Sequence, residues 1–360
     1  MNLSQFLLRM PKAELHVHLE GSMSPQTLLT LARRRGVDLP ANDEVGLRDW
    51  FRFRDFDHFV SVYLTCSRCL QHPEDFQLLV RDFCAEQERQ NVRWSEVHLT
   101  IGTHALNGGN PGEILDAVAE AIRESERARD VRMRLIFDIV RNVPRQADLT
   151  LEYALLGATQ GGPVVALGLS GFEASAPTAP FREHFAEAKR LGLHRVAHAG
   201  EHGGPPVIRE ALEIALAERI GHGVRAVEDP ALIEELVTRG IPLEVCPSSN
   251  VCLGVFPDMK SHSFDRLYRA GVKVSVNSDD PPMFETTLTK DFERLGETFG
   301  YSPAELAGFA IAGLRQSFMP AGEKAALERE YRAEIAALGE ELLGVPVIPA
   351  EGPEVRDDRS

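Results

Sequence analysis

The sequence predicts an α/β protein built as one parallel barrel, the (β/α)8 or TIM barrel. Short runs rich in Val, Ile and Leu alternate with longer amphipathic segments through most of the 360 residues. Such runs are typical of strands buried on both faces, and eight strand-then-helix units indicate a closed barrel rather than an open sheet. We expect a single domain over residues 1–344. The expected strands are Ala13–His18, Ser95–Thr100, Arg134–Val140, Val164–Leu169, Arg195–His198, Arg219–His222, Leu243–Cys246 and Val272–Asn277.

The segments between the strands carry helical patterns. Clear examples are Pro111–Ala128, Phe181–Leu191 and Pro230–Arg239, and residues 302–343 add helices after the last strand. Residues 24–89 form an extra helical insertion after the first strand. Its FRFRDFDHF stretch places aromatic side chains either in the core or in a lid over a ligand-binding mouth. Residues 345–360 are rich in Pro and charge, and we expect a flexible tail there.

Composition excludes several partner classes. The net charge of -15 argues against a nucleic-acid partner, because a polyanion is repelled by an acidic protein. No stretch reaches the roughly 18 apolar residues that a membrane helix needs. Five cysteines at irregular spacing do not suggest a disulfide framework, and no signal peptide is recognised, so a cytoplasmic protein is expected. The sequence indicates no oligomeric state.

Polar residues stand at the carboxyl ends of the predicted strands. His16 and His18 alternate on the first strand and so point to the same face. His198 ends the fifth strand, His222 ends the sixth, and Asp279-Asp280 follows the eighth. Because the carboxyl ends of barrel strands meet at one rim, we expect these side chains to gather there.

Three imidazoles and one carboxylate suit a zinc ion that keeps one position open for water. Bound zinc lowers the pKa of that water to about 7, which provides hydroxide at neutral pH. We therefore assign one Zn²⁺ ion to His16, His18, His198 and Asp279.

Three further residues have both a catalytic and a structural interpretation. Glu201, three positions after His198, can exchange a proton with the attacked atom, or it is an acid in the first turn of a helix. His222 can orient the hydroxide and stabilise developing charge, or it is a hydrogen-bonded rim histidine. Asp280 either binds a ligand or shapes the turn before Pro281.

Four motifs carry a family resemblance. MPKAELHVHLEGS, VAHAGE, RIGHG and VSVNSDDP occur in this order, and the span from Met10 to Met319 resembles the adenosine deaminase family of the amidohydrolase superfamily. The resemblance implies a barrel of the metal-dependent hydrolase type that removes the 6-amino group of a small adenine compound, giving ammonia and a 6-oxopurine. It also implies roles for the matching residues. His16, His18, His198 and Asp279 match the zinc ligands, Glu201 the acid that protonates N1, His222 the histidine beside the hydroxide, Asp280 the carboxylate that binds N7, and Gly171 the glycine whose amide meets N3.

The substrate beyond the purine ring is left open by the residues. Adenosine deaminases usually have Asp where this chain has Glu20 and Phe172. The sequence around Glu20 and the CPSSN motif are similar to those of adenine deaminases. A third branch deaminates aminodeoxyfutalosine in menaquinone synthesis, and there Arg52, Arg54 and Phe56 would hold the carboxyphenyl end of the substrate. A surface helix with a packed apolar face explains the same three residues.

Two other classes share parts of this pattern. A catalytically silent binding barrel would be expected to have lost a ligand or Glu201, and neither is missing. An amidohydrolase that opens an amide or lactone would share the zinc ligands but has no particular need for Glu201, Asp280 and Gly171 around a purine.

Overall fold

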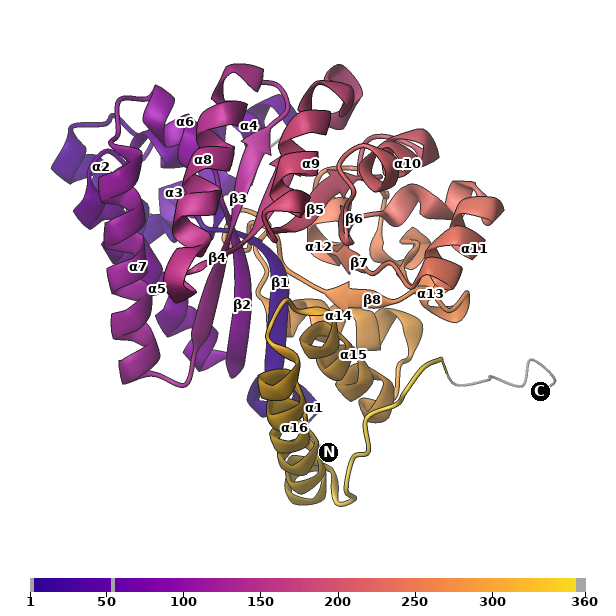
Figure 1. Cartoon of the computed structure of the whole chain (residues 1–360). Coiled ribbons are helices and arrows are strands. Elements are labelled where there is room, and N and C mark those ends of the chain that lie inside the picture. Colours follow the sequence, from indigo (N-terminus) through magenta and orange to yellow (C-terminus); the bar gives the residue numbers. More distant parts are fainter. Residues whose placement is uncertain (1–2, 53–55, 354–360) are drawn as a thin grey trace.

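The computed structural model describes residues 3–52 and 56–353 and has one sheet of eight parallel strands, in the order β1 to β8 (Figure 1). A bridge between Val17 and Asp279 joins the first strand to the segment after the last, so the sheet closes into a barrel. Every expected strand is present, and only the ends differ from the prediction. The strands are β1 (Lys12–His18), β2 (Val92–Leu99), β3 (Arg132–Val140), β4 (Val164–Ser170), β5 (His194–Ala199), β6 (Arg219–His222), β7 (Leu243–Val245) and β8 (Val274–Val276).

Helices surround the barrel, and their ends follow local sequence signals. Asn110 and Asp229 accept hydrogen bonds from the first free N–H groups of α7 and α11, and Ser302 with Glu305 forms a capping box on α15. The helices are α1 (Leu3–Arg9), α2 (Pro25–Arg35), α3 (Glu44–Phe51), α4 (Phe56–Arg68), α5 (Pro73–Arg89), α6 (Ile101–Leu106), α7 (Pro111–Ala128), α8 (Ala147–Ala158), α9 (Arg182–Arg190), α10 (Pro205–Glu213), α11 (Pro230–Arg239), α12 (Pro247–Cys252), α13 (Phe264–Arg269), α14 (Leu288–Phe299), α15 (Pro303–Gln316) and α16 (Ala321–Leu343).

The insertion after β1 consists of α2, α3 and α4, and α5 is the barrel helix that leads into β2. Helix α4 lies over the carboxyl ends of the strands, because Phe59 stacks on Phe284 at 5.6 Å and the ring of Tyr63 lies 6.3 Å from that of His18. Phe51, at the end of α3, is fully buried. The aromatic residues of the insertion therefore divide between core packing and a cover over the strand ends.

Residues 345–353, which we expected within the flexible tail, are held against α15. The N–H of Ala350 donates to the carbonyl of Ala304 at 2.9 Å, and Glu351 pairs with Arg315 and Arg332. These contacts join residues far apart in the chain, and a composition-based prediction does not include them. Residues 354–360 lie outside the described part.

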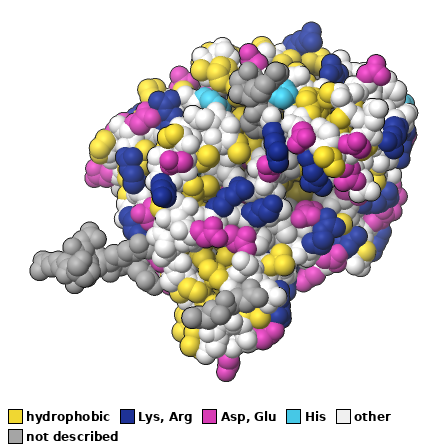
Figure 2. All heavy atoms as spheres, turned by 180° about the vertical axis from the view of Figure 1, so that it is seen from behind, with side chains coloured by type: hydrophobic (Ala, Val, Ile, Leu, Met, Phe, Trp, Pro, Cys, Tyr) yellow, Lys and Arg dark blue, Asp and Glu magenta, His cyan; other side chains and the backbone are white. Residues whose placement is uncertain are grey.

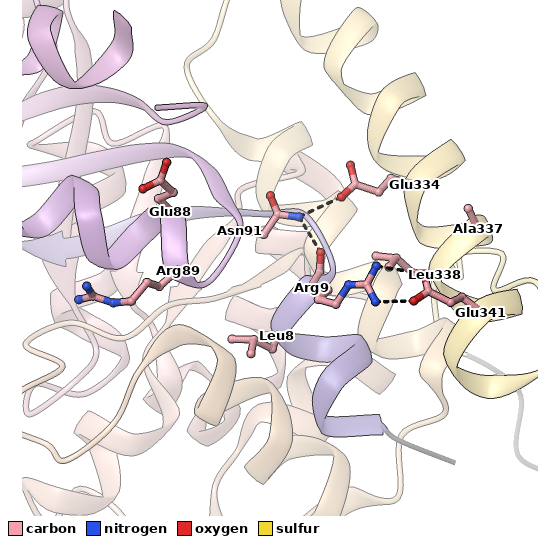
Figure 3. A pocket seen from close by; sticks show the side chains of 9 residues that line it. All are labelled: Leu8, Arg9, Glu88, Arg89, Asn91, Glu334, Ala337, Leu338 and Glu341. Atoms are coloured by element: carbon pink, nitrogen blue, oxygen red, sulfur yellow. Dashed lines mark hydrogen bonds and ion pairs between the residues drawn. The ribbon is translucent and has the colours of Figure 1, made fainter. Parts of the chain in front are cut away.

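The outer surface mixes charges of both signs, as one face shows in Figure 2. Within residues 3–52 and 56–353, no helix is long and apolar enough to cross a membrane. A pocket of about 490 Å³ lies between α1, the end of α5 with Asn91, and α16, at the amino-terminal end of the barrel (Figure 3). It is therefore at the opposite end from the histidines that end β1, β5 and β6.

Candidate active site

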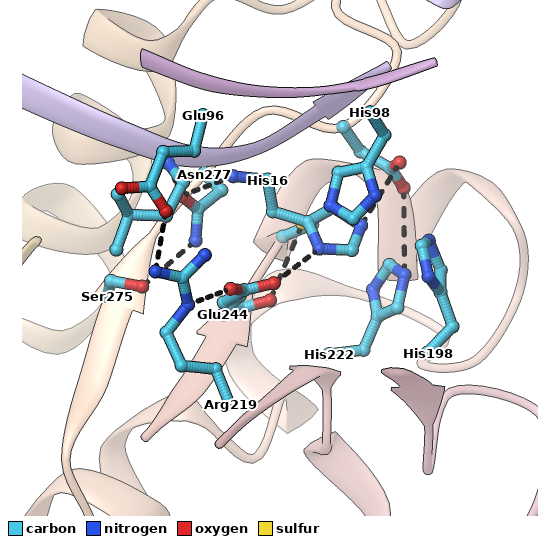
Figure 4. Close-up of polar contacts among 12 residues, drawn as sticks. His16, Glu96, His98, His198, Arg219, His222, Glu244, Ser275 and Asn277 are labelled. Atoms are coloured by element: carbon cyan, nitrogen blue, oxygen red, sulfur yellow. Dashed lines mark hydrogen bonds and ion pairs between the residues drawn. The ribbon is translucent and has the colours of Figure 1, made fainter. Parts of the chain in front are cut away.

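Four polar side chains meet at the carboxyl ends of β1, β5 and β8 (Figure 4 shows His16 and His198). The Nε2 atoms of His18 and His198 are 3.1 Å apart, and Oδ1 of Asp279 is 3.4 Å from Nε2 of His18 and 3.7 Å from Nε2 of His16. Ligand atoms bound tetrahedrally at about 2.1 Å are about 3.4 Å from one another. Three distances among the four predicted ligands, His18 to His198, His18 to Asp279 and His16 to Asp279, are close to this value.

The imidazole rings are oriented with bare nitrogens toward this centre. Nδ1 of His16 donates to Glu244 at 2.9 Å, and Nδ1 of His198 donates to the carbonyl of Leu169 at 3.1 Å. Nε2 of His16 is buried without a hydrogen-bond partner. Burial, together with the neighbouring imidazoles, lowers the pKa of His16 and His198 well below the ordinary value, so both rings are neutral at pH 7. Neutral imidazole is the form that binds a metal, so the donor set fits the predicted ion.

Glu244 is a buried residue in contact with His16 that we did not predict from the sequence. Its second oxygen accepts from Nε of Arg219 at 2.5 Å, and Arg219 also pairs with Glu96 at 2.6 Å (Figure 4). This buried chain of charges fixes the carboxylate that orients His16. The available signal was an acidic residue inside a strand that is otherwise apolar.

Glu201 and His222 lie beside the predicted ligands. Nε2 of His222 is 3.7 Å from Oε2 of Glu201 and 4.0 Å from Oδ2 of Asp279. Burial opposes ionisation of Glu201, but His222 and His202 outweigh it and lower the pKa of that carboxyl. Glu173, which we did not predict, accepts the N–H groups of Gly200, Glu201 and Gly203 and so fixes the loop that carries Glu201.

His222 and Asp279 share an unusual backbone conformation. Their φ angles are 63° and 66°, in the left-handed region that residues other than glycine rarely adopt. Each such residue costs on the order of 1–3 kcal/mol, and residues of this kind cluster at functional sites. The strained backbone therefore lies at the carboxyl ends of β6 and β8, where the polar side chains of the site also lie.

Asp280 and Glu20 form the acidic side of the site. Burial, followed by the charges of Asp279, Glu20 and Glu201, raises the pKa of Asp280 well above its usual range, and its Oδ1 atom has no hydrogen-bond partner. A Cβ atom on Gly21 would lie 1.5 Å from that oxygen, so only glycine fits beside Asp280.

Glu20 is completely buried. Its Oε1 atom accepts hydrogen bonds from the N–H and hydroxyl of Thr100 and from Nε2 of His104, whereas Oε2 has no partner. Burial alone would raise its pKa, but these donors lower the pKa of Glu20 to about 2. The residue is therefore an ionised acceptor with one unused oxygen.

The remaining predicted residues lie further out. Gly171 is exposed after β4 with a φ of 93°, which only glycine adopts readily. Phe56 packs on Phe172 at 4.9 Å and on His202 at 5.1 Å, next to Glu201. Arg52 is exposed and pairs with Glu285 at 2.7 Å, so the structure does not bring it to the buried centre. Arg54 lies outside the described residues.

Comparisons with known proteins agree with this geometry. A family model described as adenosine deaminase matches residues 11–333. The chain is 36% identical over 334 residues to the adenine deaminase of Cupriavidus necator, which covers 92% of this chain and 93% of the relative. It is 37% identical over 337 residues to the aminodeoxyfutalosine deaminase of Streptomyces coelicolor, with 93% and 87% covered.

A solved structure extends the likeness to three dimensions. The adenine deaminase from Arthrobacter aurescens superposes with a TM-score of 0.84 at 33% identity, covering 89% of this chain and 98% of that one. The family model matches residues 11–333, a range that includes all eight strands of the barrel. The chain therefore belongs to the adenosine deaminase family and is a hydrolytic deaminase of the amidohydrolase superfamily.

Proposed function

We propose that the protein hydrolyses the 6-amino group of an adenine ring, with one zinc ion held by His16, His18, His198 and Asp279. The observation that carries the proposal is the cluster of buried ligand atoms from three histidines and one aspartate, three pairs of which lie 3.1–3.7 Å apart, beside Glu201 and His222. The relatives named adenine deaminase and aminodeoxyfutalosine deaminase support an adenine-type ring as the substrate. The reaction consumes water and releases ammonia and a 6-oxopurine.

Each side chain of the site has a separate role in the proposed reaction. When bound, zinc supplies a water molecule whose pKa is lowered to near 7. Glu201, whose lowered pKa leaves it ionised, takes a proton from the attacking water and delivers it to N1, which makes C6 electrophilic. It then carries the second proton of that water from the hydroxyl on C6 to the departing amine. His222 faces the attacking oxygen and stabilises the charge that develops there. Asp280 and the backbone N–H of Gly171 orient the ring through N7 and N3.

The leading substrates are aminodeoxyfutalosine and adenosine. Phe56 and Phe172 form an apolar surface beside Glu201 that would accommodate an aromatic group beyond the ribose. Arg52 would bind the carboxylate of such a group only after leaving Glu285.

Free adenine is the second candidate, and Glu20 favours it. Its unused Oε2 atom belongs to an ionised, buried carboxylate close enough to Asp280 to raise the pKa of that residue. A buried acceptor without a donor is costly, and the N9–H group of free adenine would satisfy it. A nucleoside has no hydrogen at N9.

The test is to assay adenine, adenosine and aminodeoxyfutalosine with the purified, zinc-loaded enzyme, following ammonia and the absorbance change of the ring. We expect ammonia from at least one compound and no ammonia after chelation. The compound with the highest kcat/KM shows whether the substrate is a nucleoside or free adenine. A metal-loaded protein that releases no ammonia from any purine contradicts the proposal and favours a silent binding barrel.

A further inference from the structure

Behind His222, on the side away from Glu201, lie two buried polar residues that the proposed reaction does not use. Asn250, in α12, is completely buried, and His262, just before α13, is 2% exposed. Nδ2 of Asn250 is 3.2 Å from Nδ1 of His222, and Oδ1 of Asn250 is 3.2 Å from Nε2 of His262. The three side chains therefore form one continuous line of hydrogen bonds that ends at the active site.

The direction of every hydrogen bond in this line is set by one backbone group. The N–H of Phe264 can only donate, and it lies 3.0 Å from Nδ1 of His262. Nδ1 of His262 is thus an acceptor, and in the neutral ring the proton is on Nε2. That N–H donates to Oδ1 of Asn250, which leaves the amide NH₂ of Asn250 facing His222.

We propose that Asn250 and His262 are positioning residues that keep Nδ1 of His222 bare, so that the ring carries its proton on Nε2. Because Asn250 donates to Nδ1 of His222, that nitrogen is bare, and Nε2–H points toward Glu201 and Asp279. His222 therefore meets the attacking oxygen as a hydrogen-bond donor and not as a proton acceptor. The inference deepens the proposed function and rests on it for its catalytic meaning, since it leaves Glu201 as the group that moves protons.

Neighbouring groups keep the donors and acceptors of these hydrogen bonds in the order described. Turning the amide of Asn250 over would set its NH₂ against the N–H of His262, and the backbone anchor at Phe264 prevents His262 from changing its tautomer in response. Burial lowers the pKa of His262 to about 3, so this ring is neutral at neutral pH. The ring of Phe256 packs against His262 at 4.5 Å. The carbonyl of Asn250 accepts from Val255 and Phe256, which fixes its backbone.

A matched pair of substitutions tests the direction of the line. In His262→Gln the side-chain amide still offers an N–H to Asn250, whereas in His262→Glu the carboxylate accepts, turns the amide of Asn250 over and moves the proton of His222 to Nδ1. Asn250→Asp has the same effect directly. We expect kcat to fall about 100-fold in His262→Glu and Asn250→Asp, the usual cost of one lost transition-state donor, with KM changed less than 3-fold. His262→Gln should keep at least ten times the kcat of His262→Glu, and the zinc content of all three should be unchanged.

A spectroscopic readout on the wild-type enzyme decides the proposal even where a variant fails to fold. In ¹⁵N-histidine-labelled, zinc-loaded protein, the ring nitrogens of His222 are assigned by their loss in His222→Asn. We expect Nε2 at a protonated, pyrrole-type shift and Nδ1 at a bare, pyridine-type shift. The reverse pattern, or equal kcat in His262→Gln and His262→Glu, overturns the proposal. Because this readout needs no substrate, a failure of the proposed deamination is distinguished from a failure of the tautomer assignment.

Discussion

The Nε2 atoms of His18 and His198 lie 3.1 Å apart inside the barrel, although the two residues are separated by 180 positions in the chain. At this distance the two nitrogens share a hydrogen bond when His18 carries its proton on Nε2, and two bare nitrogens would instead bind one cation. Asp279, 3.4 Å from the same nitrogen of His18, supplies the carboxylate that the proposed zinc site needs.

The carboxylate of Glu244 should set the metal affinity. Because it orients His16 through Nδ1 and raises the basicity of the ring, Glu244→Gln is expected to weaken zinc binding 10- to 100-fold. Competition with a chromophoric chelator measures the change. Glu235→Gln, on the exterior helix α11, is the matched control and should bind zinc as the wild type does. An unchanged affinity in Glu244→Gln would show that the hydrogen bond to His16 has no part in the site.

Glu201 should act on the chemical step and not on the metal. We expect Glu201→Gln to lower kcat by a factor of about 10² to 10⁴, because the amide cannot transfer a proton to N1. Zinc content and melting temperature should stay within error of the wild type. A variant that keeps full kcat assigns proton transfer to another group, and a variant that loses zinc makes Glu201 a ligand.

Gly21 should be irreplaceable because of Asp280. A Cβ atom at position 21 would lie 1.5 Å from Oδ1 of Asp280, so Gly21→Ala must displace that carboxyl group. We expect kcat/KM to fall at least 100-fold, on the order of 3 kcal/mol of transition-state stabilisation. Gly322→Ala, in α16 with open space around it, is the control and should be neutral or more stable by up to about 1 kcal/mol. Equal activity in the two variants would remove Asp280 from the site.

Glu20 should make stability depend on pH in the acidic range. Its pKa is lowered from about 4.5 to about 2 by Thr100 and His104, so the folded protein binds fewer protons than the unfolded chain between these values. The contribution, about 3 kcal/mol at neutral pH, is complete above pH 4.5 and is lost as pH falls toward 2. In the presence of a chelator, urea unfolding should show the difference between wild type and Glu20→Gln narrowing by about 2 kcal/mol from pH 5 to pH 3. A difference that does not vary with pH would show that Glu20 is not ionised in the fold.

Much of the fold could be predicted because barrel strands carry a strong local signal. Runs such as Val164–Leu169 are short, apolar and bounded by polar residues, and only their ends moved, by one to three positions. The ends moved because strand pairing, and not the apolar run, decides where a strand stops. The division of residues 24–89 into a three-helix insertion and the barrel helix α5 was not predicted, since both parts have the same helical periodicity.

Site residues that belong to local sequence motifs could be predicted. Residues that support the site through hydrogen bonds to distant parts of the chain could not. His16 and His18 share a face of one strand, and Asp279 follows another, so strand geometry alone brought them together. Glu173, Glu244 and His262 act through hydrogen bonds to residues 12 to 228 positions away, and no local pattern records such a contact. Of these three residues, only Glu244 could have been noticed in the sequence, because it is a charged residue within an apolar strand.

The metal content of the purified protein, combined with its X-ray absorption spectrum, shows whether one zinc ion occupies the proposed site. We predict one zinc ion per chain with three nitrogen ligands and at least one oxygen ligand, and less than about a tenth of that content in His198→Ala or Asp279→Ala, with activity lost in proportion. His184→Ala, on α9, is the control and should keep both metal and activity. Full deaminase activity in protein stripped of metal, or wild-type zinc content in both ligand variants, would show that the four residues do not hold a catalytic zinc ion.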